Sequence, residues 1–380
     1  MALLITRHIA VVVCGVILLA GCSTTSLKLN SASIPQAQLD DLLTGEVFLG
    51  HQVAASELPD IDVLSSDKEM KSFLERYVLP YKYKQDRVHH LLHALFSPGV
   101  HGMRYQAEET KTAREAFHTR SGNCLAFTNM FIALAREAGL KAHYQNVLVA
   151  PEWAKSDNSI MLRRHVNVVV DLNRFKRRTI DFNSSVGGKV VAEGDVIDDN
   201  EAFAQYFNNI AIEYLHAKDY PQTFLYLRKA LATDPKSAFT WSNLGVLYRR
   251  VDELKRAETA LLYALELNPK EQVAMSNLAR VSLDLGKTEE SKYYSALVKK
   301  FRLKNPYYLL ALAQRELKAG KYQGALDYLA RAKSIKPTES ALYKLQAEIY
   351  TLQGRTQLAT RSEQKAVEYS AEQWRQRPSP

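Results

Sequence analysis

Cysteine is scarce in this chain: only Cys14, Cys22 and Cys124 occur among its 380 residues. Their spacing does not match the Cys/His pairs of a structural zinc site, and the chain also lacks a glycine-rich phosphate-binding loop. We therefore expect neither a metal nor another cofactor. Hydrophobic residues make up 46% and charged residues 24% of the chain, which is ordinary for a globular protein and argues against wholesale disorder. The length leaves room for two domains.

Long runs of one charge sign are also missing, since no Lys/Arg run exceeds three residues. The net charge is +9, and it arises in residues 200–380, which hold 28 Lys/Arg against 19 Asp/Glu, whereas residues 1–199 hold 22 of each. A basic half favours an acidic partner, anionic lipid or nucleic acid. It also fits an evenly solvated helical surface. Because the charges are dispersed, we prefer that second interpretation and expect no nucleic-acid partner.

The N-terminus has the pattern of a processing signal. Arg7 and His8 precede an apolar run, residues 9–20, that is too short for a comfortable transmembrane span. The run leads into the sequence LAGC, which ends at Cys22 and resembles the lipobox of bacterial lipoproteins. The resemblance implies cleavage before Cys22 and acylation of that residue, so residues 1–21 are the predicted signal peptide. The alternative is a chance cysteine at the end of a signal anchor.

Ser23 follows the predicted lipidation site, at the position where Asp is the usual inner-membrane retention signal. The resemblance therefore implies an outer-membrane lipoprotein that faces the periplasm, with residues 23–36 as a flexible polar tether. Cleavage removes Cys14 and acylation uses Cys22, so Cys124 is the remaining thiol and has no partner for an internal disulfide. That thiol is either buried and inert or present for its reactivity.

The C-terminal half contains an internal repeat of 34 residues. Its frames begin, without insertion, at Ala204, Ala238, Gln272, Pro306 and Ser340. The second frame shows the pattern most fully, at Trp241, Leu244, Gly245, Tyr248, Ala257, Leu261, Ala264 and Pro269. The third frame is the weakest, because serines replace small or aromatic residues at Ser282, Ser291 and Ser295 and Leu303 stands where proline is expected.

These residues match the tetratricopeptide repeat signature, in which small side chains stand where two helices touch and a proline closes the second helix. The resemblance implies an all-α tetratricopeptide (TPR) solenoid of five repeats at residues 200–373, with a tail at 374–380. Such a solenoid presents a concave face that commonly binds peptides or extended segments. A rigid spacer, or an intramolecular lid on the first domain, is the alternative.

The N-terminal half contains a second informative segment, residues 120–140. Nearly every residue from Leu125 to Ala135 is apolar or small, which predicts a helix buried on most sides, and Gly139 predicts its end. Cys124 then lies at the N-terminus of that helix, where unpaired backbone N–H groups and the helix dipole favour a thiolate. Gly122 allows another backbone, or a substrate, to approach closely.

Further helices and strands are predicted on both sides of this segment. Residues 67–96, with Asp67 as N-cap, and residues 110–118 have helical patterns, and strands are predicted at 141–150, 161–172 and 178–182. If the last two strands pair about the turn between them, His165 lies roughly opposite residue 183, and Asp181 is its diagonal neighbour. A thiol at a helix N-terminus, a strand histidine and a carboxylate that orients it are what nucleophilic thiol catalysis requires.

The Gly-Asn-Cys helix start at Cys124, followed in order by His165 and Asp181, resembles the transglutaminase-like superfamily, and more narrowly its bacterial exported members, which include cysteine proteinases. The resemblance covers roughly residues 85–185. It implies a papain-like α+β domain, which we place at residues 67–199. It also implies Cys124 as the nucleophile, His165 as general base and acid, and Asp181 as the residue that orients the histidine.

The residue that stabilises the oxyanion is less evident from the sequence. Animal transglutaminases use an aromatic residue whose equivalent we do not identify, which leaves Trp153 and Gln106 as candidates. The backbone N–H of Cys124 is the safer donor, because a helix N-terminus supplies it. Asp171 competes with Asp181 as the orienting carboxylate, but it would lie at the far end of its strand, so we prefer Asp181.

Two alternatives remain for these residues. A lone cysteine in an apolar helix is often a packed core residue, and the order of Cys124 with a histidine and an aspartate is what favours catalysis. The histidines upstream could suggest a metal site, but solvated helical histidines are the preferred interpretation for His89, His90, His93 and His101.

Two classes of function follow from the sequence. The first is a membrane-anchored lipoprotein enzyme that acts through a Cys124 thioester on amide bonds of a protein or peptide, by hydrolysis or by acyl transfer. Its tether and N-terminal extension occupy residues 22–66, and its repeats recruit the protein substrate or a partner. The second is a scaffold lipoprotein whose transglutaminase-like domain is a non-catalytic binding module.

The lipoprotein hypothesis makes a direct prediction. Replacement Cys22→Ser should abolish acylation and leave uncleaved precursor, because the acyl group is attached to the sulfur of that residue. Membrane fractionation after labelling with radioactive palmitate measures both effects. Continued incorporation of label by the Cys22→Ser chain would contradict the hypothesis.

Overall fold

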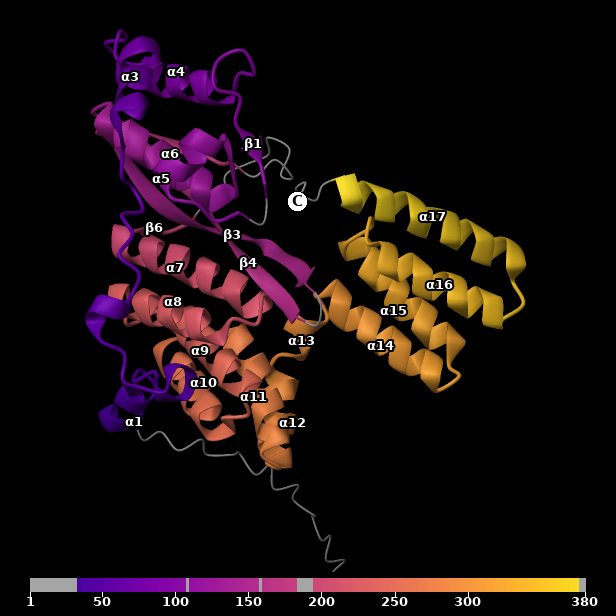
Figure 1. Cartoon of the computed structure of the whole chain (residues 1–380). Coiled ribbons are helices and arrows are strands. Elements are labelled where there is room, and N and C mark those ends of the chain that lie inside the picture. Colours follow the sequence, from indigo (N-terminus) through magenta and orange to yellow (C-terminus); the bar gives the residue numbers. More distant parts are fainter. Residues whose placement is uncertain (1–32, 107–108, 157–158, 183–193, 376–380) are drawn as a thin grey trace, which may run out of the picture. The chain divides into compact units, whose positions relative to one another are not determined.

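The computed structural model describes residues 33–106, 109–156, 159–182 and 194–375 (Figure 1), and for residues 147–165 and 371–375 it describes the backbone alone. The chain divides into two units, residues 1–33 and 34–380, and the features below belong to the second unit. The predicted signal peptide and the predicted lipidation site, Cys22, lie outside the described residues.

The first domain opens with two helices where the sequence pattern suggested one helical stretch. Helix α3 (Lys68–Tyr77) begins at the predicted N-cap, since the Asp67 carboxylate accepts a hydrogen bond from the Met70 N–H. Helix α4 (Lys84–Phe96) follows after a break. Pro80 lies in the break, and proline ends a helix because it lacks an N–H and its ring clashes with the preceding turn.

A short helix and a long buried helix follow. Helix α5 (Ala113–Thr119) is capped by Thr112, and helix α6 (Cys124–Glu137) is buried over eleven consecutive residues, Leu125–Ala135. The predicted end of α6 is confirmed at Gly139, whose φ of 75° is one that glycine adopts without strain. Short strands β1 (Arg104–Tyr105) and β2 (Ser121–Gly122) pair in parallel just before α6.

An antiparallel sheet of order β5-β4-β3-β6 packs against α6. Its strands are β3 (Lys141–Ser156), β4 (Ser159–Asn173), β5 (Lys176–Ile180) and β6 (Val196–Ile197). Strand β5 pairs with residues 168–173 of β4, and β6 pairs only with Tyr144 and Gln145 of β3. Strands β3 and β4 continue beyond these pairs as a two-stranded hairpin (Figure 1).

Helices, most of them in pairs, follow from residue 199 to residue 375. They are α7 (Asp199–His216), α8 (Tyr220–Thr233), α9 (Ala238–Arg250), α10 (Leu254–Leu267), α11 (Gln272–Asp284), α12 (Thr288–Leu297), α13 (Lys299–Arg302), α14 (Pro306–Lys318), α15 (Tyr322–Ile335), α16 (Ser340–Leu352) and α17 (Thr356–Arg375). Helices α9, α11, α14 and α16 begin at the predicted frame starts. The predicted fold class, an α+β domain followed by a TPR-type all-α region, is therefore confirmed.

The hydrophobic core of the repeats divides at the third frame, which was the weakest in the sequence. One cluster of buried side chains extends to Tyr294, and a separate cluster begins at Leu309. Between them α12 ends early and the short α13 follows. Arg302 of α13 ties this segment to α11, because its guanidinium donates to the Ser276 hydroxyl at 3.1 Å and to the Ser276 carbonyl oxygen at 2.9 Å.

The first repeat shares the core of the first domain. Tyr206 and Phe207 of α7 belong to the same buried cluster as α6 and the sheet. Arg136 at the end of α6 donates to both carboxylate oxygens of Asp199 at the start of α7, at 2.6 and 2.8 Å. The hydrophobic core thus continues past residue 200, where the sequence pattern changes from domain to repeats.

The N-terminal segment, residues 34–57, holds helices α1 (Gln36–Asp41) and α2 (Glu46–Leu49) and the 3-10 turn η1 (Ala55–Glu57). It packs on the first two repeats. The Tyr248 hydroxyl donates to the Leu42 carbonyl oxygen at 2.8 Å, and the Phe48 ring stacks on Phe224 at 5.1 Å. From Ile34 onward the segment is therefore a packed part of the repeat region, although residues 23–36 were predicted to be a flexible tether.

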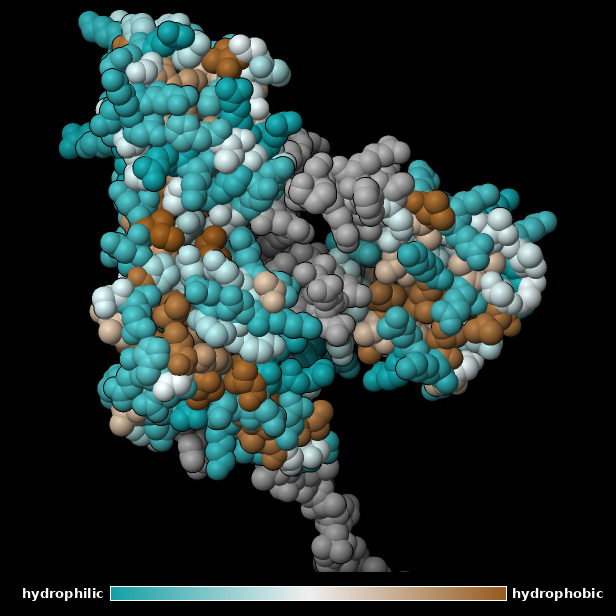
Figure 2. Space-filling view, viewed as in Figure 1, coloured by the Kyte–Doolittle hydropathy of each residue, from teal (hydrophilic) through white to brown (hydrophobic). Residues whose placement is uncertain are grey.

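Hydrophilic side chains cover most of the visible surface of the described residues, and exposed hydrophobic residues occur in small groups (Figure 2). Among the described side chains, the most exposed large apolar one is Phe175, 94% exposed in the turn between β4 and β5. Across the described helices, none combines the length and the apolar character needed to cross a bilayer.

The repeat packing predicts the effect of enlarging Gly245. A Cβ at this residue would lie 2.6 Å from Leu261 Cγ and 3.1 Å from the Ala257 carbonyl oxygen, so α9 and α10 would have to move apart. Replacement Gly245→Leu should lower the free energy of unfolding by about 1–3 kcal/mol. The damage should extend to neighbouring repeats, because each repeat is stabilised by the next.

Thermal and urea unfolding of the full chain measure this loss. Gly99→Leu is the matched control, since a Cβ at Gly99 meets no atom within 4 Å. Equal stability of the Gly245→Leu and Gly99→Leu chains would mean that the repeat frame is misplaced.

Candidate active site

Cys124 is the first residue of α6, and the backbone around it is firmly held. The Asn123 side-chain oxygen accepts from the Ala126 N–H at 2.9 Å and caps the helix. The Asn123 amide nitrogen donates to Thr110 Oγ1 at 3.0 Å, and the Asn123 backbone N–H donates to the Glu109 carbonyl oxygen at 3.0 Å. The thiol is free and half-buried, and it faces the partial positive charge of the helix N-terminus.

Gly122 is needed for the close packing that the sequence suggested. A Cβ at Gly122 would lie 2.6 Å from the Ala126 Cβ, so a larger residue would push β2 away from the first turn of α6. Gly122 pairs with Tyr105 across the β1–β2 ladder, and its carbonyl oxygen accepts from the Gln106 N–H at 2.9 Å. Strand β1 therefore lies directly beside the residues that lead into Cys124.

A network of polar side chains links residues that precede α6. The Lys111 ammonium donates to Ser121 Oγ at 2.8 Å and to Thr119 Oγ1 at 3.0 Å, and it pairs with the Glu109 carboxylate. With its amide nitrogen facing these acceptors, Gln106 donates to Ser121 Oγ at 3.1 Å and to Glu109. The Gln106 amide is thus engaged in this network, which leaves the backbone N–H of Cys124 as the better oxyanion donor of the two.

His165 lies in β4, where its backbone pairs with Val147 of β3. The next pair along the hairpin is Glu152 with Arg163, so the regular ladder is interrupted immediately beside His165. The His165 side chain, like that of the second oxyanion candidate, Trp153, lies outside the described residues. The structure therefore gives the backbone position of the predicted base and no contact of its imidazole.

Asp181 follows β5, and the strand register is the predicted one. Val168 pairs with Ile180 and Val169 with Thr179, a register that places residue 183 across from residue 165 when it is continued. Residue 183 lies outside the described residues. The competing carboxylate, Asp171, is paired with Arg177 at 2.9 Å and with His143 at 3.4 Å at the other end of the strand.

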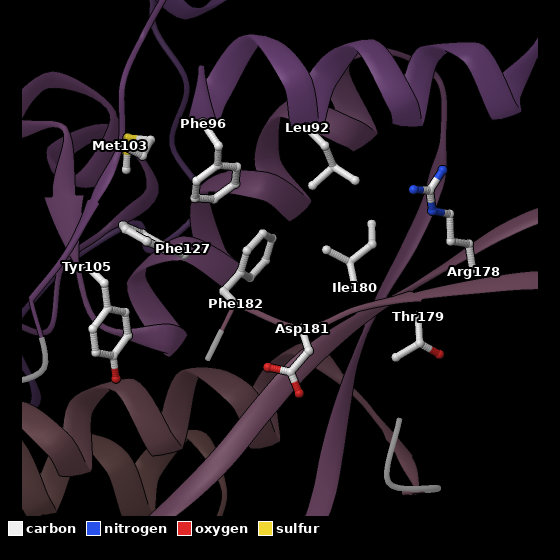
Figure 3. A pocket seen from close by; sticks show the side chains of 10 residues that line it. All are labelled: Leu92, Phe96, Met103, Tyr105, Phe127, Arg178, Thr179, Ile180, Asp181 and Phe182. Carbon is white, nitrogen blue, oxygen red and sulfur yellow. The ribbon is translucent and has the colours of Figure 1, made fainter. Parts of the chain in front are cut away.

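A cavity of about 540 Å³ opens between α4, β1, α6 and β5 (Figure 3). It is lined by Leu92, Phe96, Met103, Tyr105, Phe127, Arg178, Thr179, Ile180, Asp181 and Phe182. Phe127 is on the same side of α6 as Cys124, one turn further on. Phe127 of α6 and Asp181 thus line the same cavity, whose lining residues do not include Cys124. The sequence did not indicate it, because its aromatic residues have the same pattern as core residues.

One of the upstream histidines, His101, is not solvated as expected. His101 is 8% exposed rather than solvated, because the chain leaves α4 at Phe96 and folds back into the core. Its ring stacks on Phe117 at 4.2 Å and bonds to the Phe117 carbonyl oxygen at 2.8 Å, and burial lowers the pKa of His101. In the described part of the chain, no three His, Cys, Asp or Glu side chains gather as metal ligands would.

A protein-family model matches most of the first domain. Residues 72–178 match the family described as the transglutaminase-like superfamily, and the match includes Cys124 and His165 but ends just before Asp181. No curated protein sequence matches the chain.

Solved structures similar to part of the chain are helical. MamA from Desulfovibrio magneticus RS-1 is 15% identical with a TM-score of 0.31, and the similarity covers 46% of this chain and 98% of MamA. Pseudomonas aeruginosa PilF is 20% identical with a TM-score of 0.31, over 44% of this chain and 82% of PilF. YrrB, described as a TPR protein with an unusual peptide-binding site, is 16% identical with a TM-score of 0.27, over 44% of this chain and 86% of YrrB.

At these identities and TM-scores, the likenesses bear on no functional property of this chain. The TPR type of the C-terminal region is evident from its own helix pairs and their regular spacing. The chain thus carries a transglutaminase-like domain at residues 72–178, followed by a helical region of the TPR type.

Proposed function

We propose that this protein is a thiol enzyme that acts on amide bonds of a protein or peptide through a Cys124 thioester. The observation that carries the proposal is the position of the thiol. Cys124 begins a buried helix in a transglutaminase-like domain, and that helix also lines a cavity in which Asp181 takes part. A packed core cysteine is fully buried, whereas Cys124 is half-buried.

The chemistry assigns one role to each residue. His165 takes the proton of the Cys124 thiol as the sulfur attacks the amide carbonyl, and the Cys124 N–H donates to the oxyanion that forms. His165 then gives that proton to the leaving amine, and a thioester remains. Asp181 orients the imidazole. Water or a second amine resolves the thioester, and the outcome depends on how well the site excludes water.

The repeats in this proposal recruit the protein substrate or a partner to the domain. Support comes from the contact between the first repeat and the loop before Cys124. The Thr110 N–H donates to the Glu213 carboxylate of α7 at 3.3 Å, and the Thr110 hydroxyl holds the Asn123 cap. A partner bound to the first repeat would therefore be held close to the reacting end of α6.

The proposal also includes a lipid anchor at Cys22 that holds the protein at the outer membrane, facing the periplasm. The support is the LAGC sequence that ends at Cys22, with Ser23 after it. An anchored enzyme of this kind would act on proteins or peptides in the periplasm.

The triad predicts how alkylation of Cys124 depends on pH. His165→Ala should slow iodoacetamide labelling more at pH 6–7 than at pH 9, where an ordinary thiol of pKa about 8.5 is largely ionised without assistance. Asp181→Ala should have a smaller effect, because the carboxylate only orients the ring. Mass spectrometry of tryptic peptides should follow the rate on the peptide that contains Cys124.

Cys124→Ala is the blank for this experiment and should remove label from its peptide. If the wild-type rate follows the pH profile of an ordinary thiol and His165→Ala leaves it unchanged, the catalytic proposal fails. The chain would then be a scaffold with a non-catalytic transglutaminase-like module.

The helix cap makes a second prediction. Asn123→Ala should cost about 1 kcal/mol of stability, because it removes the cap of α6. It should also slow labelling of Cys124, since the first turn of α6 frays. Asn305→Ala is the matched control, because Asn305 caps α14 through the Tyr307 and Tyr308 N–H groups.

Chemical unfolding and the labelling rate should be measured for both cap variants. Both should lose similar stability, and the labelling rate should fall only for Asn123→Ala. Equal labelling rates in the two variants would show that the cap does not control the thiol.

A further inference from the structure

The cavity beside α6 has a composition that suggests what enters it. We propose that it binds a large apolar side chain, preferably aromatic, of an extended peptide substrate that lies along the outer edge of β5. This inference deepens the proposed function, on which it rests for the peptide's role as substrate. It names the class of residue that the enzyme accepts close to the attacked amide.

The cavity is lined largely by apolar side chains from separate elements, although Thr179 and Asp181 also line it. Leu92 and Phe96 belong to α4, Phe127 belongs to α6, and Ile180 and Phe182 belong to β5 and the residues just after it. Since separate elements hold these walls, the cavity exists before any ligand binds. Its volume of about 540 Å³ is ample for an aromatic side chain.

Three phenylalanine rings in the cavity wall form an aromatic cluster. The Phe96 and Phe182 rings stack at 5.6 Å, with an angle of 26° between their planes. The Phe127 ring meets Phe182 edge-on at 6.1 Å, with an angle of 90°. An aromatic guest can add offset or edge-to-face contacts to this cluster, which a branched aliphatic guest cannot make.

Strand β5 explains why the guest belongs to an extended chain. In the four-stranded sheet β5 is the edge strand, and in the described part of the chain no strand pairs with its outer side. Residues 178–180 of β5 and the two residues that follow it line the cavity, so the cavity lies along this strand. An exposed edge offers backbone N–H and C=O groups that an extended peptide can pair with.

The ends of the cavity are polar, which fits a peptide rather than a fully apolar ligand. In Figure 3, Arg178 lies at one end and Tyr105 at the other, with the phenylalanine rings between them. The Arg178 side chain makes no hydrogen bond or ion pair within the part of the chain that the structure describes. Its guanidinium can therefore donate to a carbonyl oxygen of the bound segment.

The test measures peptide binding separately from catalysis. Full-length Cys124→Ala protein is titrated calorimetrically with alanine pentapeptides, blocked at both ends, that carry Phe, Leu, Ala or Asp at the centre. We expect the Phe peptide to bind about tenfold more tightly than the Ala peptide. The affinity for the Leu peptide should lie between these two values, and the Asp peptide should bind most weakly.

Filling the cavity should remove this preference. Leu92→Trp in the Cys124→Ala background should reduce binding of the Phe peptide to the level of the Ala peptide. Leu283→Trp is the matched control, because Leu283 is 56% exposed on α11, away from the cavity. Phe96→Ala, which removes one aromatic wall, should also weaken binding of the Phe peptide. This second variant tests the inference if Leu92→Trp fails to fold.

Equal affinity for the Phe and Ala peptides, or unchanged Phe binding in both folded cavity variants, would overturn the inference. Iodoacetamide labelling of Cys124 in the wild-type chain is a separate measurement of the thiol, since this small reagent carries no side chain for the cavity to bind. The cavity can therefore fail as a binding site while the thiol still behaves as proposed. Conversely, peptide selectivity in the Cys124→Ala protein would stand even if the thiol proves unreactive.

Discussion

The burial of α6 is the constraint on which the rest of the first domain depends. Thr128 donates to the Val166 carbonyl oxygen of the sheet, and Asn129 is held by the Tyr144 hydroxyl at 2.8 Å and by the Lys111 carbonyl oxygen at 3.3 Å. A helix packed on all sides cannot rotate or slide without opening the core. Its first residue, Cys124, and the cavity wall at Phe127 are therefore fixed relative to each other.

The same helix connects the domain to the repeats. The Arg136–Asp199 pair joins the end of α6 to the start of α7, and Tyr206 carries α7 into the core of the domain. The first repeat consequently cannot move apart from the helix that bears the thiol. Any force that a partner exerts on α7 acts directly on the framework of the candidate active site. The later repeats, whose core is separate from Leu309 onward, lack this connection among their buried residues.

Sequence patterns predicted those features that depend on neighbours along the chain. The frames of 34 residues predicted the starts of α9, α11, α14 and α16, because small residues and prolines recur wherever two helices of one repeat touch. The apolar run after Cys124 predicted a buried helix, and Gly139 predicted its end. Strand alternation and a short turn predicted the register of β4 with β5. Each of these signals lies within one helix, one hairpin or one repeat.

Contacts between distant segments decided the remaining features. The sequence by itself determined an α+β domain with a thiol at a helix N-terminus, followed by TPR-type repeats. The cavity, the fusion of α7 with the domain core and the packing of residues 34–57 on the first repeats came only from the tertiary structure. Leu92, Phe127 and Phe182 look like ordinary core residues in the sequence, because an apolar pattern shows that a side chain is covered but not what covers it. Whether such a residue fills a core or lines a cavity depends on how closely the facing elements approach.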